Sequence, residues 1–484
     1  MKKSAKMNFI YNVFYKILVI ILPLITAPYI SRVIGANGLG IYSYTHSIVY
    51  YFSLLTLLGV KNYGNRAIAK VRDDKEKLSK TFWSIYYFQI VMGFIMLGIY
   101  LTYVIIFDKN YTTISLIQSL FIISAILDIN WLFFGLEEFK ITVTRNSIIK
   151  ILTLIMIFLF IKCSQDLWKY TLIMASMTML SQLVLWSFLK KQVKICKVSF
   201  REITRHIKPN IILFIPIIAI SIYKTMDKIM LGAMTTVDEV GFYENAEKTI
   251  NIPLTIITAL GTVMLPKISN IVAKGEKENI EKYISKSIKF VMFLSFAMCA
   301  GLISIGYDFS TLFFGEEFQK TGELTILLAF TLPFISFANV LRTQYLIPNE
   351  RDKDYIISVI IGAVINLIFN LIFIPNFLSC GACIGTIAAE FVVMFYQMYI
   401  LRKNLPIRNY LWNLIPFGIK AIIMFIIVYS INFIYINSVF MKIIIQIFVG
   451  IIVYCILNYK YIKSNIDINK IFSKFRDKKK YDNI

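Results

Sequence analysis

The chain is poor in charged residues and in the residue types from which catalytic centres are built. Only 16% of its 484 residues are Asp, Glu, Lys or Arg, whereas 58% are hydrophobic. Soluble globular proteins carry about 25% charged residues. There are two histidines and six cysteines, and we find no zinc-ligand spacing, phosphate-binding glycine loop or Ser/His/Asp arrangement. We therefore set aside a soluble protein and expect neither an enzyme nor a cofactor or metal.

The sequence instead contains many long apolar runs. Runs of about 20 residues can cross about 30 Å of hydrocarbon as α-helices. The first run lacks a small-residue cleavage site, so we interpret it as a membrane span and not as a signal peptide. We predict an all-α polytopic membrane protein with fourteen spans, at 9–30, 41–60, 81–106, 113–135, 147–161, 168–189, 209–231, 241–265, 287–306, 323–346, 355–376, 380–401, 413–434 and 439–459.

The distribution of Lys and Arg predicts the orientation. Most of the 51 basic residues lie at the N-terminus, in alternate loops and in the C-terminal tail, whereas the other loops hold only Arg32, Lys109, Lys162 and Lys320. Basic loops remain in the cytoplasm, so we predict both termini there. This asymmetry also accounts for the net charge of +23 without nucleic acid. The basic tail is expected to touch anionic membrane lipids.

The sequence contains an internal repeat. "RVIGANGLGIYSYTHSI" (32–48) and "KIMLGAMTTVDEVGFYENAEKTI" (228–250) both have Gly-Ala, a short polar link and Gly-x-Tyr. Two six-span units with the same orientation would face each other across a substrate site. We predict an N-terminal bundle at 1–208, a second bundle at 209–402, two additional helices at 403–460 and a basic tail at 461–484.

Charged residues inside the predicted spans are candidate site residues, because charge in a membrane is usually paired or faces water. Most lie on the first two helices of each repeat, where a two-fold transporter lines its cavity. We predict substrate binding by Lys16, Lys224, Asp227, Lys228, Glu244, Glu247 and Lys248. For Asp227 the simplest role is to neutralise a neighbouring lysine. Four other residues are candidates for coupling or structure, namely His46, Asp128, Glu390 and Lys420.

Several other polar residues have simpler explanations. Lys150, Lys169, Arg342 and Lys442 lie near span ends, where long side chains reach the interface. His206 lies in a basic loop and is expected to be solvated.

Three stretches resemble a known family. "LDINWLFFGLEEFKITVTRNSIIK" (127–150), "LFIPIIAISIYKTMDKIMLG" (213–232) and "LPLITAPYISRVIGANGLGIYSY" (22–44) resemble Wzx-type polysaccharide flippases of the multidrug/oligosaccharidyl-lipid/polysaccharide exporter superfamily. The resemblance implies two bundles in a V shape and transport of undecaprenyl-diphosphate-linked oligosaccharide for O-antigen, capsule or another surface polysaccharide. It also implies that the two extra helices form a groove for the lipid tail, as in lipid II flippases. A polysaccharide polymerase and a chain-length regulator are the partners it suggests.

Two alternatives stay open at this point. A cation-coupled multidrug exporter of the same fold would need anionic cavity groups, and the first span offers Lys16 and no carboxylate. A membrane glycosyltransferase or polysaccharide polymerase would need a long extramembrane segment, which the predicted loops lack. Coupling to H⁺, Na⁺ or membrane potential is not decided by the sequence.

Overall fold

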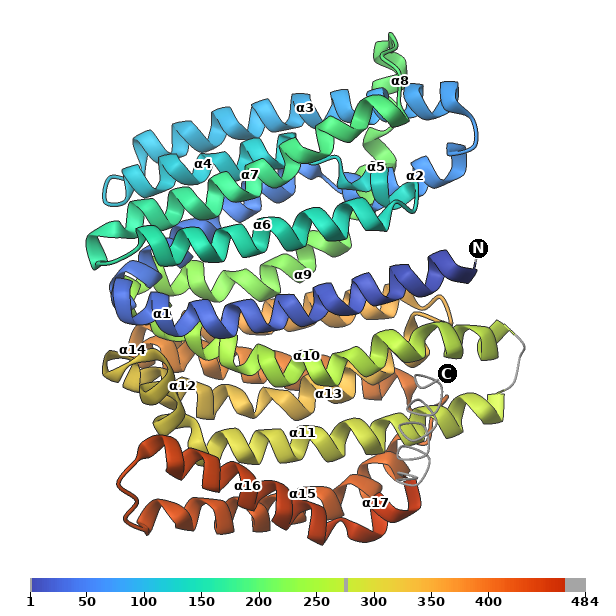
Figure 1. The fold of residues 1–484 in the computed structure, drawn as a ribbon. Coiled ribbons are helices and arrows are strands. Elements are labelled where there is room, and N and C mark those ends of the chain that lie inside the picture. The colour runs from blue at the N-terminus through green and yellow to red at the C-terminus, as the bar shows by residue number, and fades with distance from the viewer. Residues whose placement is uncertain (1, 274–276, 466–484) are drawn as a thin grey trace, which may run out of the picture. The chain divides into compact units, whose positions relative to one another are not determined.

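The computed structural model describes residues 2–273 and 277–465, without the side chains of 2–17 and of a few later positions. The described chain is helical almost throughout (Figure 1). The α-helices are α1 (Lys2–Leu57), α2 (Val60–Val71), α3 (Lys75–Ile106), α4 (Thr112–Ile126), α5 (Asn130–Gly135), α6 (Phe139–Phe160), α7 (Leu167–Gln192), α8 (Phe200–Thr204), α9 (Ile207–Met234), α10 (Val237–Ala273), α11 (Lys277–Phe314), α12 (Gln319–Ala329), α13 (Thr331–Leu341), α14 (Asp352–Leu401), α15 (Ile407–Ser430), α16 (Val439–Leu457) and α17 (Tyr459–Asn465).

These helices make the chain a multi-pass membrane protein. Within the described residues nine helices are long and apolar enough to span a bilayer, or ten if the bent pair of segments 316–329 and 331–346 counts as one span. Two long helices each contain a pair of predicted spans. Gly35 (φ 77°) interrupts α1 and Leu378 (φ 53°) interrupts α14. The all-α prediction is confirmed, and the number fourteen stays a prediction.

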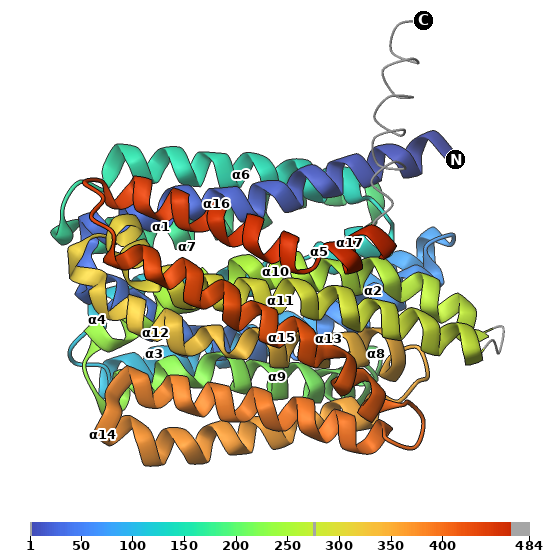
Figure 2. The same cartoon turned by 90° about the horizontal axis from the view of Figure 1, so that it is seen from below.

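The chain divides into two compact units. The first comprises Met1–Lys248, Phe313–Leu324 and Ile356–Ala389, and the second comprises Thr249–Leu312, Thr325–Tyr355 and Glu390–Ile484. In the first unit α1 packs against α3, α4 and α6, and α4 also packs against α7. In the second unit α15 packs against α16 (Figure 2). The predicted domain boundaries remain a prediction.

Two repeat-related glycines allow a very close helix crossing in the first unit. A Cβ atom on Gly40 of α1 would lie 1.8 Å from the carbonyl oxygen of Val237, and one on Gly241 of α10 would lie 2.2 Å from that of Ala36. The two glycines are equivalent in the sequence repeat. Glycine at both positions lets the backbones meet, as small residues do in membrane helix pairs. The crossing therefore places the polar start of α10 directly against α1.

Candidate functional site

Four of the predicted site residues form one ion-pair cluster on α9 and α10. The ammonium group of Lys228 lies 2.9 Å from Glu244 Oε2 and 3.0 Å from Glu247 Oε2. Lys248 lies 3.2 Å from the other oxygen of Glu244. Ser43 of α1 donates a hydrogen bond of 2.7 Å to Glu244. The cluster carries two positive and two negative charges, and these neutralise each other.

Asp227 lies next to this cluster in sequence but has different partners. Its side chain is buried and accepts hydrogen bonds from Tyr243 (2.7 Å), Thr386 (2.8 Å) and Asn370 (2.6 Å). No lysine of the described chain forms an ion pair with it. The expectation that Asp227 neutralises a neighbouring lysine is therefore wrong. Asp227 and Lys228 are consecutive residues of α9, so their side chains point in directions about 100° apart. Asp227 therefore meets uncharged donors from α10 and α14.

Other predicted residues of the first unit do not join the cluster. The side chain of Lys16 lies outside the described residues. Lys224 is exposed and forms no ion pair with the described part of the chain. His46 packs between rings, with centroids 5.5 Å from Tyr42 and 4.9 Å from Phe121. These contacts are those of a packing histidine.

The second unit holds two of the three remaining predicted residues. Glu390 lies in the C-terminal part of α14, and Lys420 of α15 donates a 3.2 Å hydrogen bond to Asn458. Lys442, which we expected only to reach the interface, forms an ion pair with Asp308. Each of these lysines therefore has a partner within the protein.

Asp128 belongs to a different site, built where α4 ends and α5 begins. A helix break leaves carbonyl groups without intrahelical partners. The amide of Gln89 on α3 donates to the carbonyls of Ala125, Ile126 and Asp128 over 2.8–3.1 Å. Trp131 donates back to Gln89 Oε1 at 3.1 Å. These bonds hold the buried break in place and fix the position of the Asp128 side chain.

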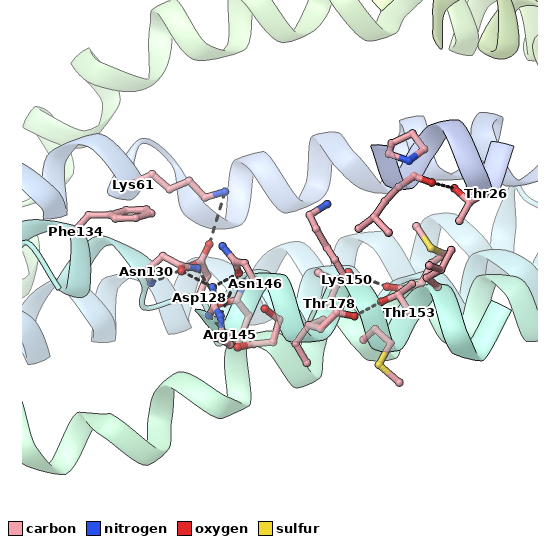
Figure 3. A pocket seen from close by; sticks show the side chains of 18 of the residues that line it. Thr26, Lys61, Asp128, Asn130, Phe134, Arg145, Asn146, Lys150, Thr153 and Thr178 are labelled. Atoms are coloured by element: carbon pink, nitrogen blue, oxygen red, sulfur yellow. Dashed lines mark hydrogen bonds and ion pairs between the residues drawn. The ribbon is translucent and has the colours of Figure 1, made fainter. Parts of the chain in front are cut away.

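Asp128 faces a cavity of about 700 Å³ inside the N-terminal helices (Figure 3). Its carboxylate accepts two hydrogen bonds from Asn130 and lies 3.6 Å from the ammonium group of Lys61. Asn130 in turn accepts a 2.8 Å bond from Arg145, which is 6% exposed. Arg145 also donates to Asn146. The one carboxylate of this cavity is thus neutralised, and the cationic groups exceed it in number.

Lys150 is a further cation of the cavity. It lies on α6, one helical turn beyond Asn146, and points into the cavity, where it is half-buried (Figure 3). No described residue forms an ion pair or hydrogen bond with its ammonium group. Lys150 was expected to reach the membrane interface at a span end. The structure corrects that expectation, because α6 begins at Phe139 and places Lys150 about three turns inside the helix.

Threonine hydroxyls and Tyr170 add neutral polar groups to the lining. Thr26, Thr153 and Thr178 donate to carbonyls of their own helices, so their oxygens are left as acceptors. Together with the cations, these groups can bind a ligand that carries both negative charge and hydroxyl groups. In the described residues no group of three or more His, Cys, Asp or Glu side chains could hold a metal ion.

The sequence analysis did not predict this cavity, although several of its residues lie in one stretch of the chain. Asp128, Asn130, Arg145, Asn146 and Lys150 all lie in the stretch 127–150 that carries the family resemblance. Arg145 lies just before the predicted span 147–161, so the hydropathy pattern places it in a loop. The spacing of Asn130, Arg145 and Asn146, all polar and close to deep Asp128, was the signal that could have identified the site.

His206 also differs from its expectation. It is 2% exposed, and its ring lies 2.7 Å from the Tyr63 hydroxyl and 2.8 Å from that of Ser84. It therefore ties α9 to α2 and α3 and is not solvated.

The second unit has an apolar groove of about 510 Å³. Its lining comes from α11, α13, α14 and α15 and includes Phe296, Phe334, Met394 and Trp412. Arg408 is the one charged residue among those that line it. A groove of this chemistry suits a hydrocarbon chain.

Comparison with known proteins relates the chain to a polysaccharide biosynthesis family and to proteins named as O-antigen transporters. A family model described as "Polysaccharide biosynthesis protein" matches residues 5–272, more than half of the chain. A protein of Escherichia coli (strain K12) named "Putative O-antigen transporter" is 24% identical over 410 residues, which cover 83% of this chain and 98% of that protein. Its namesake in Shigella dysenteriae is 22% identical and covers 78% of this chain and 94% of its own length.

A solved structure shows the same fold. The lipid II flippase MurJ in an inward closed conformation aligns with a TM-score of 0.75 at 18% identity, covering 95% of this chain and 99% of that one. The similar proteins carry the names of transporters and flippases, which confirms the expectation of a transport protein over an enzyme.

Proposed function

Because the chain belongs to the polysaccharide biosynthesis protein family, we propose that it is a flippase. Its substrate is an oligosaccharide repeat unit linked through diphosphate to undecaprenol. The head group of this lipid cannot cross hydrocarbon alone, whereas the polyprenyl tail stays in the membrane. The protein carries the head group from the cytoplasmic to the outer leaflet of the bacterial cytoplasmic membrane, and both of its own termini are cytoplasmic.

The observation that carries this proposal is the cavity of the N-terminal helices. Its volume of about 700 Å³ falls in the range of about 300–1,000 Å³ typical of small-molecule sites. Asp128, the carboxylate in the cavity lining, already pairs with Lys61 and Asn130, whereas no described residue forms an ion pair with Lys150. A lysine of this kind can bind phosphate oxygens. Threonine and asparagine side chains in the same cavity can bind sugar hydroxyls.

The remaining parts of the molecule suit the rest of such a substrate. The apolar groove along α15 in the second unit is a candidate site for the polyprenyl tail. The repeat supports transport by alternating access, in which two bundles expose the head group first to one side and then to the other. On the outer leaflet the product would pass to a polysaccharide polymerase that works with a chain-length regulator.

The same cavity argues against the multidrug exporter. A cationic drug needs an unpaired carboxylate, and Asp128 is already neutralised. Lys150 would repel such a drug. The glycosyltransferase or polymerase alternative is weakened by the names of the relatives, which are those of transporters.

The proposal is tested by replacing Lys150 in a strain that lacks its own flippase and depends on this protein for surface polysaccharide. A charged hydrogen bond contributes about 1.5–3 kcal/mol, so Lys150→Gln should lower export roughly ten- to hundredfold. Lys150→Arg should retain part of it, because the charge is kept. Export is measured as surface polysaccharide at equal membrane levels of each variant.

Lys140→Gln is the matched control, because Lys140 lies on the same helix but is exposed. It should export normally. Full export by Lys150→Gln would show that this cavity does not bind the head group through Lys150. Efflux of a cationic dye without polysaccharide export would favour the multidrug exporter instead.

A further inference from the structure

A second basic pocket lies in the second unit, at the start of α11. Its volume is about 610 Å³. Three lysines of α11, Lys282, Lys286 and Lys289, line it together with Tyr461 and Ser464 of α17. Both views show α17 at the end of the unit where α11 begins (Figures 1 and 2). The pocket thus has a cationic wall from one helix and a hydroxyl-bearing wall from another.

The spacing of the lysines matches the layer of lipid head groups. They follow one another at intervals of four and three residues, so they share one face of α11. At about 1.5 Å per residue they extend over roughly 10 Å. The apolar run of the helix starts at Phe290, directly after Lys289. This pattern predicts that Lys289 lies at the edge of the hydrocarbon and that the other two lysines lie progressively farther out, beside the phosphates.

Aromatic contacts hold the second wall in place. The Tyr461 ring lies 4.9 Å from that of Phe417 on α15 and 5.4 Å from that of Phe293 on α11, measured between centroids. Ser464 donates a 3.1 Å hydrogen bond to the Tyr461 carbonyl. The short helix α17 is thus held against α11 and α15, and it gives the pocket its second wall.

The acidic residues that line the pocket do not balance its positive charge. Glu281 is its only acidic lining residue, against three lysines. No residue in the described ranges 2–273 and 277–465 forms an ion pair with any of these three ammonium groups. A pocket with excess positive charge at this depth is suited to an anionic phosphate ester.

We infer that this pocket binds the head group of an anionic phospholipid, such as phosphatidylglycerol, from the leaflet that the loop charges predict to be cytoplasmic. The three lysines contact the phosphate and the hydroxyls of Tyr461 and Ser464 contact the glycerol. The bound lipid is a resident of the membrane and not the transported substrate, so this inference stands apart from the proposed function.

The test measures lipid binding to the full chain in detergent micelles by native mass spectrometry. The probes are phosphatidylglycerol, zwitterionic phosphatidylcholine and inorganic phosphate as a competitor. Each lysine near a membrane surface contributes about fivefold to the binding of anionic lipid. The variant with Lys282, Lys286 and Lys289 all changed to Gln should therefore bind phosphatidylglycerol about a hundredfold more weakly, with phosphatidylcholine unaffected.

The control changes three exposed lysines outside the pocket, Lys190, Lys191 and Lys197, to Gln. It should keep normal binding. An equal loss in both triple variants would refute a specific site. If inorganic phosphate displaced the lipid completely, the pocket would be a site for free phosphate and the lipid assignment would be wrong. Should the pocket variant unfold, Lys286→Glu alone must reduce phosphatidylglycerol binding at an unchanged unfolding temperature, or the inference fails.

Discussion

Replacing Gly40 by Ala tests the helix crossing that positions the charged start of α10. Alanine usually stabilises a helix by about 1 kcal/mol relative to glycine. At Gly40 the new methyl carbon would lie 1.8 Å from the carbonyl oxygen of Val237. The obstacle is backbone, so no side chain can rotate out of the way.

The expected loss follows from this geometry. An ordinary contact between a methyl carbon and an oxygen needs about 3.4 Å, so α1 and α10 must separate by more than 1 Å, in an interior packed as densely as a crystal. Overpacking of this kind costs about 1–3 kcal/mol and occasionally more. We expect the upper end of that range, because separating the helices also strains the hydrogen bond between Ser43 and Glu244, one turn along.

The assay is thermal unfolding in detergent, followed by export of surface polysaccharide. Gly98→Ala on α3 is the matched control, because a Cβ there would meet nothing within 4 Å. Gly40→Ala should lower both the apparent unfolding temperature and export. Gly98→Ala should leave export unchanged and should leave the unfolding temperature unchanged or raise it. An unfolding temperature for Gly40→Ala at or above that of Gly98→Ala would refute the close crossing.

Two further predictions concern the charge cluster and the topology. Lys228→Gln should lower the unfolding free energy by about 3 kcal/mol and reduce export, because it removes the cation that Glu244 and Glu247 share and leaves Glu247 unpaired. Lys248→Gln should have a much smaller effect, because Glu244 keeps its contact with Lys228. Equal effects of the two changes, measured by thermal unfolding, would contradict the cluster geometry. In a cysteine-free background, a single cysteine in place of Lys75 should be protected from impermeant thiol reagents in intact cells and one in place of Asn110 should react; the reverse labelling pattern would invert the predicted orientation.

The all-α membrane fold class could be predicted from the sequence because membrane helices are defined by local composition. Length and hydropathy of each run identify a span without any knowledge of its neighbours. The breaks were also visible, since Gly35 lies in the repeat motif and the interruption at Leu378 falls between two predicted spans. The cluster of Lys228 with Glu244 lies on consecutive helices, so proximity in the chain made its members easy to group.

Partners from distant helices could not be inferred in this way. Asp227 seemed to belong with the lysines of its own helix, yet its bonds come from Tyr243, Thr386 and Asn370. His206 seemed solvated because its sequence neighbours are basic, although α2 and α3 enclose it. Such contacts depend on how helices pack, and hydropathy contains no information about packing.

The positions of unpaired charge suggest how the protein would avoid holding its substrate too tightly. In the ion-pair cluster each lysine already has a carboxylate, so an incoming phosphate would have to displace Glu244 from Lys228. No carboxylate of the described residues pairs with Lys150, so we expect Lys150 to provide the first strong contact for a head group. A transporter needs moderate affinity, because the binding energy that captures a substrate must be returned when the substrate leaves. A single free lysine supported by neutral hydroxyls and amides fits that requirement better than a cavity in which every cation is free.

Adding an acidic partner, as in Thr153→Glu, one turn from Lys150, should therefore mimic the ion-pair cluster and reduce export at normal protein levels. Normal export by Thr153→Glu would mean that Lys150 does not make the first contact.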